Sequence, residues 1–84
     1  MFGGLRFETS VVVQDWTGFV QSSVRHFTKK FGCPPKVLHC NPEVEIFVNA
    51  ALYNLGLTRS IDVMGDFDNP YSAIMLGRGQ REQR

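Results

Sequence analysis

The sequence has little of the material that builds membrane spans, disulfide scaffolds or strongly charged binding surfaces. No apolar run approaches the roughly 18–20 residues that a transmembrane helix needs. Two cysteines in 84 residues are too few for a disulfide framework. There are 9 lysines and arginines against 8 acidic residues, a formal net charge of +1. The electrostatic attraction that drives non-specific binding to nucleic acid is therefore small.

A targeting signal and a disulfide bridge are also not expected. Residues 1–8 lack the basic and apolar regions of a secretory signal. Cys33 and Cys40 flank a predicted strand, whose rise of about 3.3 Å per residue keeps their Cα atoms beyond the roughly 7 Å limit for a bridge. We therefore expect two free thiols in a soluble, cytoplasmic protein.

What the chain does contain is typical of one small globular domain. Hydrophobic residues make up 43% of it and aromatic residues 12%. These values exclude a wholly disordered chain. We predict a single folded domain over residues 1–76 and a flexible polar tail over residues 77–84.

The first half of the chain predicts one strand and one helix. Side chains alternate over residues 5–13, which indicates a strand, although its length is unusual and a turn could split it. Asp15 is a plausible N-cap, and Gly32 is a typical C-terminal residue in front of two prolines. Between them, apolar residues recur at helical spacing, so we predict a helix over residues 15–31.

A second helix follows a short strand over residues 36–40. Asn41 is a strong N-cap and Pro42 a favoured first helical residue. We predict that this helix runs to Leu55 and stops at Gly56.

The last part of the chain predicts two strands joined by a turn. The strands cover residues 57–64 and 71–76. The intervening segment, residues 65–70, is rich in Gly, Asp, Asn and Pro. We expect these two strands to pair with each other as an antiparallel hairpin.

The element order β-α-β-α-β-β predicts an α/β fold that borders on α+β: a small two-layer sandwich with a mixed sheet. Strands joined through helices should be parallel, with right-handed crossovers. Because several strands alternate in character, we expect both helices mainly on one face. The other face would be a candidate contact surface with Val12, Met64 and some of Tyr71, Ala73 and Met75.

The end of the second strand offers a weak catalytic candidate. Cys40 stands near a helix N-terminus, which can stabilise a thiolate, and His39 could act as a base. Neighbouring strand residues point to opposite faces, so the two side chains cannot readily pair. We assign no catalytic residue, and a small thiol-dependent enzyme or sensor using Cys40 stays an alternative.

No cofactor or metal is expected. One set of residues has suitable ligand atoms but lacks the spacing of a zinc site: His26, Cys33, His39 and Cys40. A second set lacks the order of a calcium loop and indicates a solvated acidic turn: Asp62, Asp66, Asp68 and Asn69.

Basic residues leave nucleic-acid binding as another alternative. Three lie on one predicted helix and the others in the predicted tail. They are Arg25, Lys29, Lys30, Arg78 and Arg81. If the tail folds near the end of that helix, they would form a modest basic patch.

The feature that best supports an interaction site is apolar surface on the helix that ends at Leu55. Besides its main stripe, this helix carries a second patch: Ile46, Ala50 and Tyr53. Surplus apolar surface marks an interaction site, unless the helix is packed between the sheet and the other helix. We therefore expect a non-enzymatic protein-interaction or self-associating module whose partner is itself or another protein, without a membrane contact.

Overall fold

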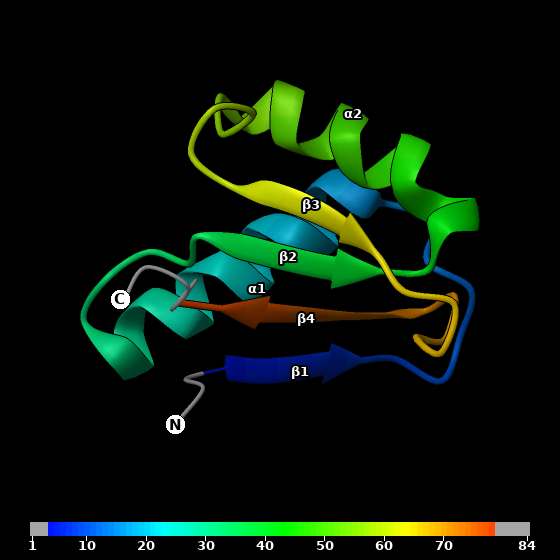
Figure 1. Ribbon diagram of the computed structural model, residues 1–84, viewed down its shortest axis with the longest axis horizontal. Coiled ribbons are helices and arrows are strands. Elements are labelled where there is room, and N and C mark those ends of the chain that lie inside the picture. The colour runs from blue at the N-terminus through cyan, green and yellow to red at the C-terminus, as the bar shows by residue number, and fades with distance from the viewer. Residues whose placement is uncertain (1–3, 79–84) are drawn as a thin grey trace.

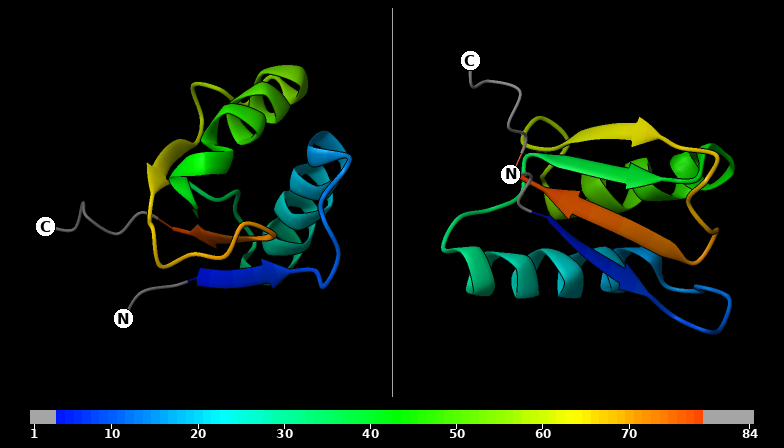
Figure 2. Two further views of the ribbon diagram at one scale, coloured as in Figure 1. Left: turned by 90° about the vertical axis from the view of Figure 1, so that its right-hand side faces the viewer. Right: turned by 60° about the horizontal axis from the view of Figure 1, so that its bottom comes forward.

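The computed structural model describes residues 4–78, which form a four-stranded mixed sheet with two helices packed on one of its faces (Figures 1 and 2). The predicted order β-α-β-α-β-β and the two-layer sandwich are confirmed. The elements are β1 (Gly4–Glu8), α1 (Trp16–Phe31), β2 (Val37–Cys40), α2 (Glu45–Leu55), β3 (Asp62–Gly65) and β4 (Ala73–Gly77).

Helix α1 begins and ends where its sequence predicts. The N–H of Gly18 donates to Asp15 Oδ1 at 3.0 Å, which satisfies one of the free N–H groups of the first turn. Gly32 closes the helix with φ of 77° and donates its N–H to the carbonyl of Thr28.

Helix α2 is preceded by a single 3₁₀ turn, Pro42–Val44. Asn41 Oδ1 accepts a hydrogen bond of 2.9 Å from the N–H of Glu43, as expected of an N-cap. Gly56 ends the helix with φ of 73°. The prediction of a capped helix from Pro42 to Leu55 is therefore confirmed, except that its first turn is tighter.

The strand predicted over residues 5–13 is shorter than expected. Strand β1 stops at Glu8, because its partner β4 begins only at Ala73. The residue pair Thr9 and Ser72 makes one more backbone bond of 3.1 Å. Beyond it, Pro70 has no N–H to donate, so the ladder cannot continue. Residues 10–14 form a loop instead.

The predicted hairpin of the last two strands is wrong. The sheet order is β1-β4-β2-β3, so β2 lies between β3 and β4. Strand β3 is parallel to β2, whereas β4 is antiparallel to both of its neighbours, β1 and β2. The strand β4, composed of Ala, Ile, Met, Leu and Gly, is largely buried, which suits the interior of the sheet.

The strand predicted over residues 57–64 is also shorter, because its first half folds into turns. The N–H of Leu57 donates to the carbonyl of Leu52 at 2.8 Å, and the N–H groups of Ser60 and Ile61 donate to the carbonyl of Leu57. Regular pairing starts only at Asp62, opposite Val37.

The core lies between the sheet and the two helices. Leu38, Ile74 and Leu76 contribute fully buried side chains from the sheet. Val20 and Phe27 meet them from α1, and the core side chains of α2 are Val48, Ala51 and Leu52. None of the described helices is both long and apolar enough to cross a membrane.

The boundary of the predicted tail differs slightly from the structure. Gly77, assigned to the tail, is the last residue of β4 and pairs with Gly4 and Val37. Residues 79–84, including Arg81, lie outside the described residues.

Candidate apolar binding groove

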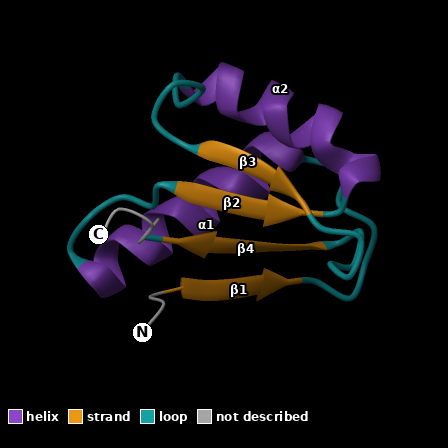
Figure 3. Cartoon of the chain, viewed as in Figure 1, coloured by secondary structure: helices purple, strands orange, loops and turns teal. Residues whose placement is uncertain are grey.

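The three connections that follow β1, β2 and β3 lie at the same end of the sheet (Figure 3). Residues of these connections line a groove. Its volume is about 540 Å³. The carboxyl ends of parallel strands are where ligands commonly gather in open sheets. We call it the apolar groove; its lining residues are Ser10, Val11, Val12, Val13, Gln14, Trp16, Val44, Phe47, Tyr71 and Ser72.

Aromatic side chains from both helices form one wall of the apolar groove. Trp16, at the start of α1, stacks on Phe47 of α2 with ring centroids 6.4 Å apart and planes 8° apart. Phe19 meets the same indole edge-to-face at 5.8 Å. Since Trp16 is half-buried and Phe47 is 52% exposed, both rings still present surface to solvent. The wall is therefore apolar and aromatic.

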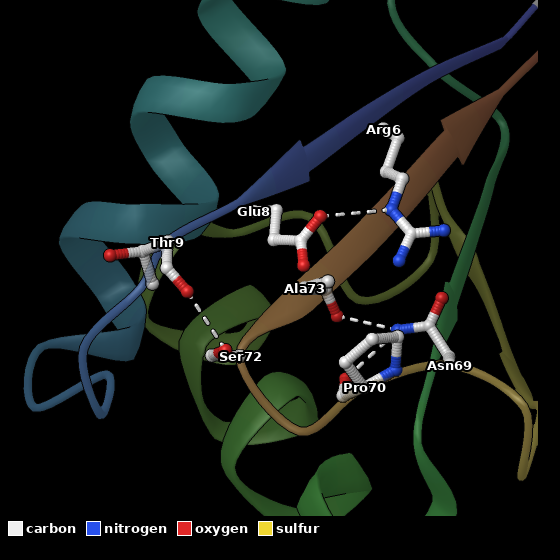
Figure 4. A network of polar contacts seen from close by, with 7 residues as sticks. All are labelled: Arg6, Glu8, Thr9, Asn69, Pro70, Ser72 and Ala73. Atoms are coloured by element: carbon white, nitrogen blue, oxygen red, sulfur yellow. Dashed lines mark hydrogen bonds and ion pairs between the residues drawn. The ribbon is translucent and has the colours of Figure 1, made fainter.

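Hydrogen bonds hold the segments that flank the groove. Ser72 Oγ donates to the carbonyl of Thr9 at 2.9 Å, which ties the loop after β1 to the residue before β4 (Figure 4). Asn69 Nδ2 donates to the carbonyl of Ala73 at 2.6 Å, and Asn41 Nδ2 donates to the carbonyl of Asn69 at 2.9 Å. The segment before β4 is thereby fixed to the end of β2.

None of the residues that line the apolar groove carries a charge at neutral pH. Its volume is within the range of about 300–1,000 Å³ typical of binding pockets. Burial of its apolar surface would stabilise an occupant, and the polar side chains of the lining are Ser10, Gln14, Tyr71 and Ser72. The groove thus fits an uncharged apolar group.

The predicted interface residues all lie on the solvent side of α2. Ile46 is 72% exposed, Tyr53 is 77% exposed, and Ala50 is exposed as well. The alternative in which the sheet and α1 bury this patch is excluded by these exposures. Phe47 lines the apolar groove and lies three residues before Ala50, a spacing that makes these two residues neighbours on the surface of α2.

The sheet face opposite the helices is only partly the contact surface that the sequence predicts. His39 of β2 lies beside Met75 of β4 and Met64 of β3 in one row across this face. Met64 is exposed and Met75 half-buried, as expected, but Ala73 is fully buried. The exposed residues Val12 and Tyr71 lie in loops and line the apolar groove.

Cys40 has the environment of a packed thiol. Its side chain is fully buried in the core cluster, whereas the register places His39 on the opposite face. Burial, and secondly the negative charge of Glu45, raise the pKa of the Cys40 thiol from 9.0 to about 11. At neutral pH the group is therefore protonated and inaccessible, unlike a reactive thiolate. Both cysteines are free thiols, as predicted.

The structure brings part of the predicted basic set together. Arg25, Lys29 and Lys30 are exposed on α1. The guanidinium of Arg78 lies over the ring of Phe31 at 5.6 Å, next to the C-terminal end of that helix. Within residues 4–78, no group of three or more His, Cys, Asp and Glu side chains is placed to hold a metal ion.

The sequence pattern does not indicate the apolar groove, because its residues fit regular elements. The valines at 11–13 fit a strand, and Trp16 and Phe47 fit the core stripes of the helices. One signal is present: Pro70 cannot donate to a ladder, so a strand that pairs with this region must end early. Three consecutive valines beyond that point would then be surface residues.

Comparisons of the chain with family models, with curated proteins and with solved structures found no match. They therefore assign the chain to no family, and the geometry of the described residues is the guide to its function.

Proposed function

We propose that this protein is a small, non-enzymatic interaction module that binds an apolar segment of another protein in the apolar groove. The module is homo-oligomeric and acts in the cytoplasm. The observation that carries the proposal is the groove itself: about 540 Å³, walled by Trp16 and Phe47, and without a charged lining residue. Two free thiols are compatible with a reducing compartment.

The outer face of α2 belongs to the same contact surface. Ile46, Ala50 and Tyr53 extend the apolar groove along the helix by way of Phe47. Tyr is enriched at protein interfaces, since its ring buries apolar area while its hydroxyl keeps a polar partner. A bound segment would lie with its apolar side chains in the groove and continue over this face.

The single tryptophan supplies the test, because Trp16 lines the groove. The probe is a dansyl-labelled amphipathic helical peptide with a leucine face. The control peptide has the same length and charge but serine in place of leucine. We expect saturable energy transfer from Trp16 to the leucine peptide only. Equal transfer to both peptides, or none, would contradict the proposal.

Variants locate the contact. Val12→Asp puts a charge at a position that is 79% exposed, so the fold should survive while peptide affinity falls about tenfold or more. Tyr53→Arg should weaken binding less, because Tyr53 lies outside the groove. Gln21→Asp, on an exposed position of α1, is the matched control and should leave the affinity unchanged. An equal loss in the control would exclude the groove as the binding site.

A second candidate function, binding to a nucleic-acid backbone, is favoured by the position of Arg78 over Phe31 beside Lys29 and Lys30. Phosphate contacts by such a patch weaken steeply with salt. We expect retention of the protein on single-stranded nucleic acid at low salt, lost in the variant Lys29→Glu with Lys30→Glu. An absence of retention at low salt would end this candidate.

A further inference from the structure

Strand β1 lies at the edge of the sheet, and no other strand of residues 4–78 pairs with its outer side (Figure 1). The N–H of Thr9 donates to the carbonyl of Ser72, in the register that sets Phe7 opposite Ile74. Alternate residues of an antiparallel strand direct their backbone groups to the same side. The odd-numbered residues of β1 therefore bond to β4, and the even-numbered ones direct N–H and C=O groups outward.

Two opposite charges stand on this free edge. Arg6 and Glu8 are both even-numbered, both about half exposed, and their side chains contact each other at 3.3 Å (Figure 4). Charges on an edge strand usually protect it from pairing with another chain. Charges of one sign would repel a second copy in every register, whereas opposite charges two residues apart complement themselves in one register.

We propose that a second copy of this chain pairs with β1 through its own β1, antiparallel about a twofold axis at Phe7, with Arg6 of each copy opposite Glu8 of the other. Only registers that match even-numbered with even-numbered residues join the free backbone groups. Moving the axis from Phe7 to Arg6 sets Arg6 opposite Arg6 of the other copy. Moving it to Glu8 sets Glu8 opposite Glu8. Like charges directly opposite are destabilising, so the complementary register is selected.

The helix-facing side of β1 fits the same arrangement. A shallow groove of about 300 Å³ runs along it, lined by Leu5, Arg6, Phe7, Ser22 and His26. Phe7 is half-buried and meets the ring of His26 edge-to-face at 5.8 Å. In the proposed register the two Phe7 residues form a non-hydrogen-bonded pair, where side chains lie closest. Each ring then covers apolar surface that the monomer leaves open.

This inference rests on the proposed function in one respect, because it supplies the contact through which the module self-associates. Pairing of the β1 strands joins two four-stranded sheets into one continuous sheet. The outer face of α2 stays free, since α2 packs near β3 at the opposite edge (Figure 2). The dimer would thus present two copies of the binding surface.

Charge reversal tests the register by sedimentation equilibrium over a dilution series. We expect a mass above 9.5 kDa for the natural chain. Arg6→Glu and Glu8→Arg should each raise the dimer dissociation constant about tenfold or more, because each places like charges opposite twice. The variant with both substitutions should recover the natural value. If both single variants dimerise weakly and the double variant does not recover the natural dissociation constant, the proposed register is wrong.

Cysteine cross-linking tests the axis independently, in a Cys33→Ser background. Phe7→Cys should form a covalent dimer on mild oxidation, because the two residues face each other at the axis. Leu5→Cys should form no covalent dimer, since its counterpart in the other copy is Thr9. A mixture of Leu5→Cys and Thr9→Cys chains should cross-link without any change at Phe7. Cross-linking of Leu5→Cys with itself would overturn the arrangement.

The outcomes separate the two proposals. A mass of 9.5 kDa at every concentration ends both the pairing of β1 and the homo-oligomeric part of the proposed function. A larger mass that falls with Tyr53→Arg but not with Arg6→Glu keeps self-association and rejects β1 as its site. Neither result bears on the binding of the leucine peptide in the groove, which the energy-transfer experiment tests separately.

Discussion

At the scale of single residues, a few capping residues fix the ends of the two helices. Asp15 starts α1, Asn41 starts the turn before α2, and two glycines with positive φ end the helices. Cys40 takes no part in a polar site and instead fills the core. Each of these roles follows from local chemistry and is therefore open to a direct test.

The buried thiol of Cys40 makes stability depend on alkaline pH. The unfolded chain loses this proton near pH 9.0, but the folded chain keeps it until about pH 11. Its contribution is complete below pH 9 and is lost as the pH rises through this window, by about 2–3 kcal/mol. Urea unfolding of the natural chain between pH 8 and pH 11 should show a steeper loss than Cys40→Ala. Parallel curves would contradict this.

The N-cap of α1 should weaken or reverse the stabilisation that a glycine-to-alanine substitution usually brings to a helix. A Cβ added at Gly18 would overlap the carboxylate of Asp15. Gly18→Ala should therefore stabilise the natural chain by less than the roughly 1 kcal/mol expected from helix propensity, or destabilise it. In an Asp15→Ala background, which itself costs about 1 kcal/mol, the same change should give the full gain. Thermal unfolding of the four variants measures the coupling, and additivity would rule it out.

At the scale of elements, the segment from β3 to β4 decides the topology. It leaves β3 at the edge, passes the end of β2 and enters the sheet between β1 and β2. The N–H of Asp66 donates to the carbonyl of Cys40 at 2.8 Å, and Asn41 holds the carbonyl of Asn69. These bonds anchor the crossing segment to the C-terminal end of β2.

Asn41 performs two tasks that one substitution can separate. Asn41→Asp keeps an oxygen for the N–H of Glu43 but loses the amide donor to the buried carbonyl of Asn69. We expect a loss of about 1–3 kcal/mol, the cost of an unsatisfied buried acceptor. A matched change at an exposed cap, Asp15→Asn, should cost little. Chemical unfolding measures both, and equal effects would show that the bond to Asn69 contributes nothing.

At the scale of the whole molecule, the last strand completes the sheet that the first strand begins. Strand β4 bonds to β1 on one side and to β2 on the other, and Ile74 and Leu76 are fully buried. Without β4, strand β1 has no partner among the described strands, and β2 pairs only with β3. Folding should therefore be cooperative, with β4 formed only in the complete structure.

Native-state hydrogen exchange should reflect the central position of β4 in the sheet. The amide of Met75 should exchange only through global unfolding, because it faces the interior strand β2, whereas the amides of Ile74 and Leu76 face the edge strand β1. Amides of the short edge strand β3 should exchange through local opening, with a smaller free energy. The measurement is exchange followed by NMR in low denaturant. Equal protection of β3 and β4 would argue against β4 as the centre of the sheet.

The sequence predicted the elements better than it predicted their pairing. Caps and glycines are local signals, so both helices were placed within a residue or a single turn. The predicted pairing of β3 with β4 was wrong because composition, and not proximity along the chain, decides which strands lie inside the sheet. Arg6, Glu8 and Asp62 mark β1 and β3 as edge strands, whereas β2 and β4 are mostly buried.

The sequence by itself determined the two capped helices, the two-layer class and the second apolar patch of Ile46, Ala50 and Tyr53, because these depend on spacing and on residues close in the chain. It left open whether the sheet and α1 bury this patch, and the structure exposes it. Only the tertiary structure decided the position of β4 and the apolar groove. The groove requires residues 10–16, α2 and residues 71–72 to meet at one end of the sheet. Contacts between these segments depend on strand order, which is set by the packing of distant segments and not by any local pattern.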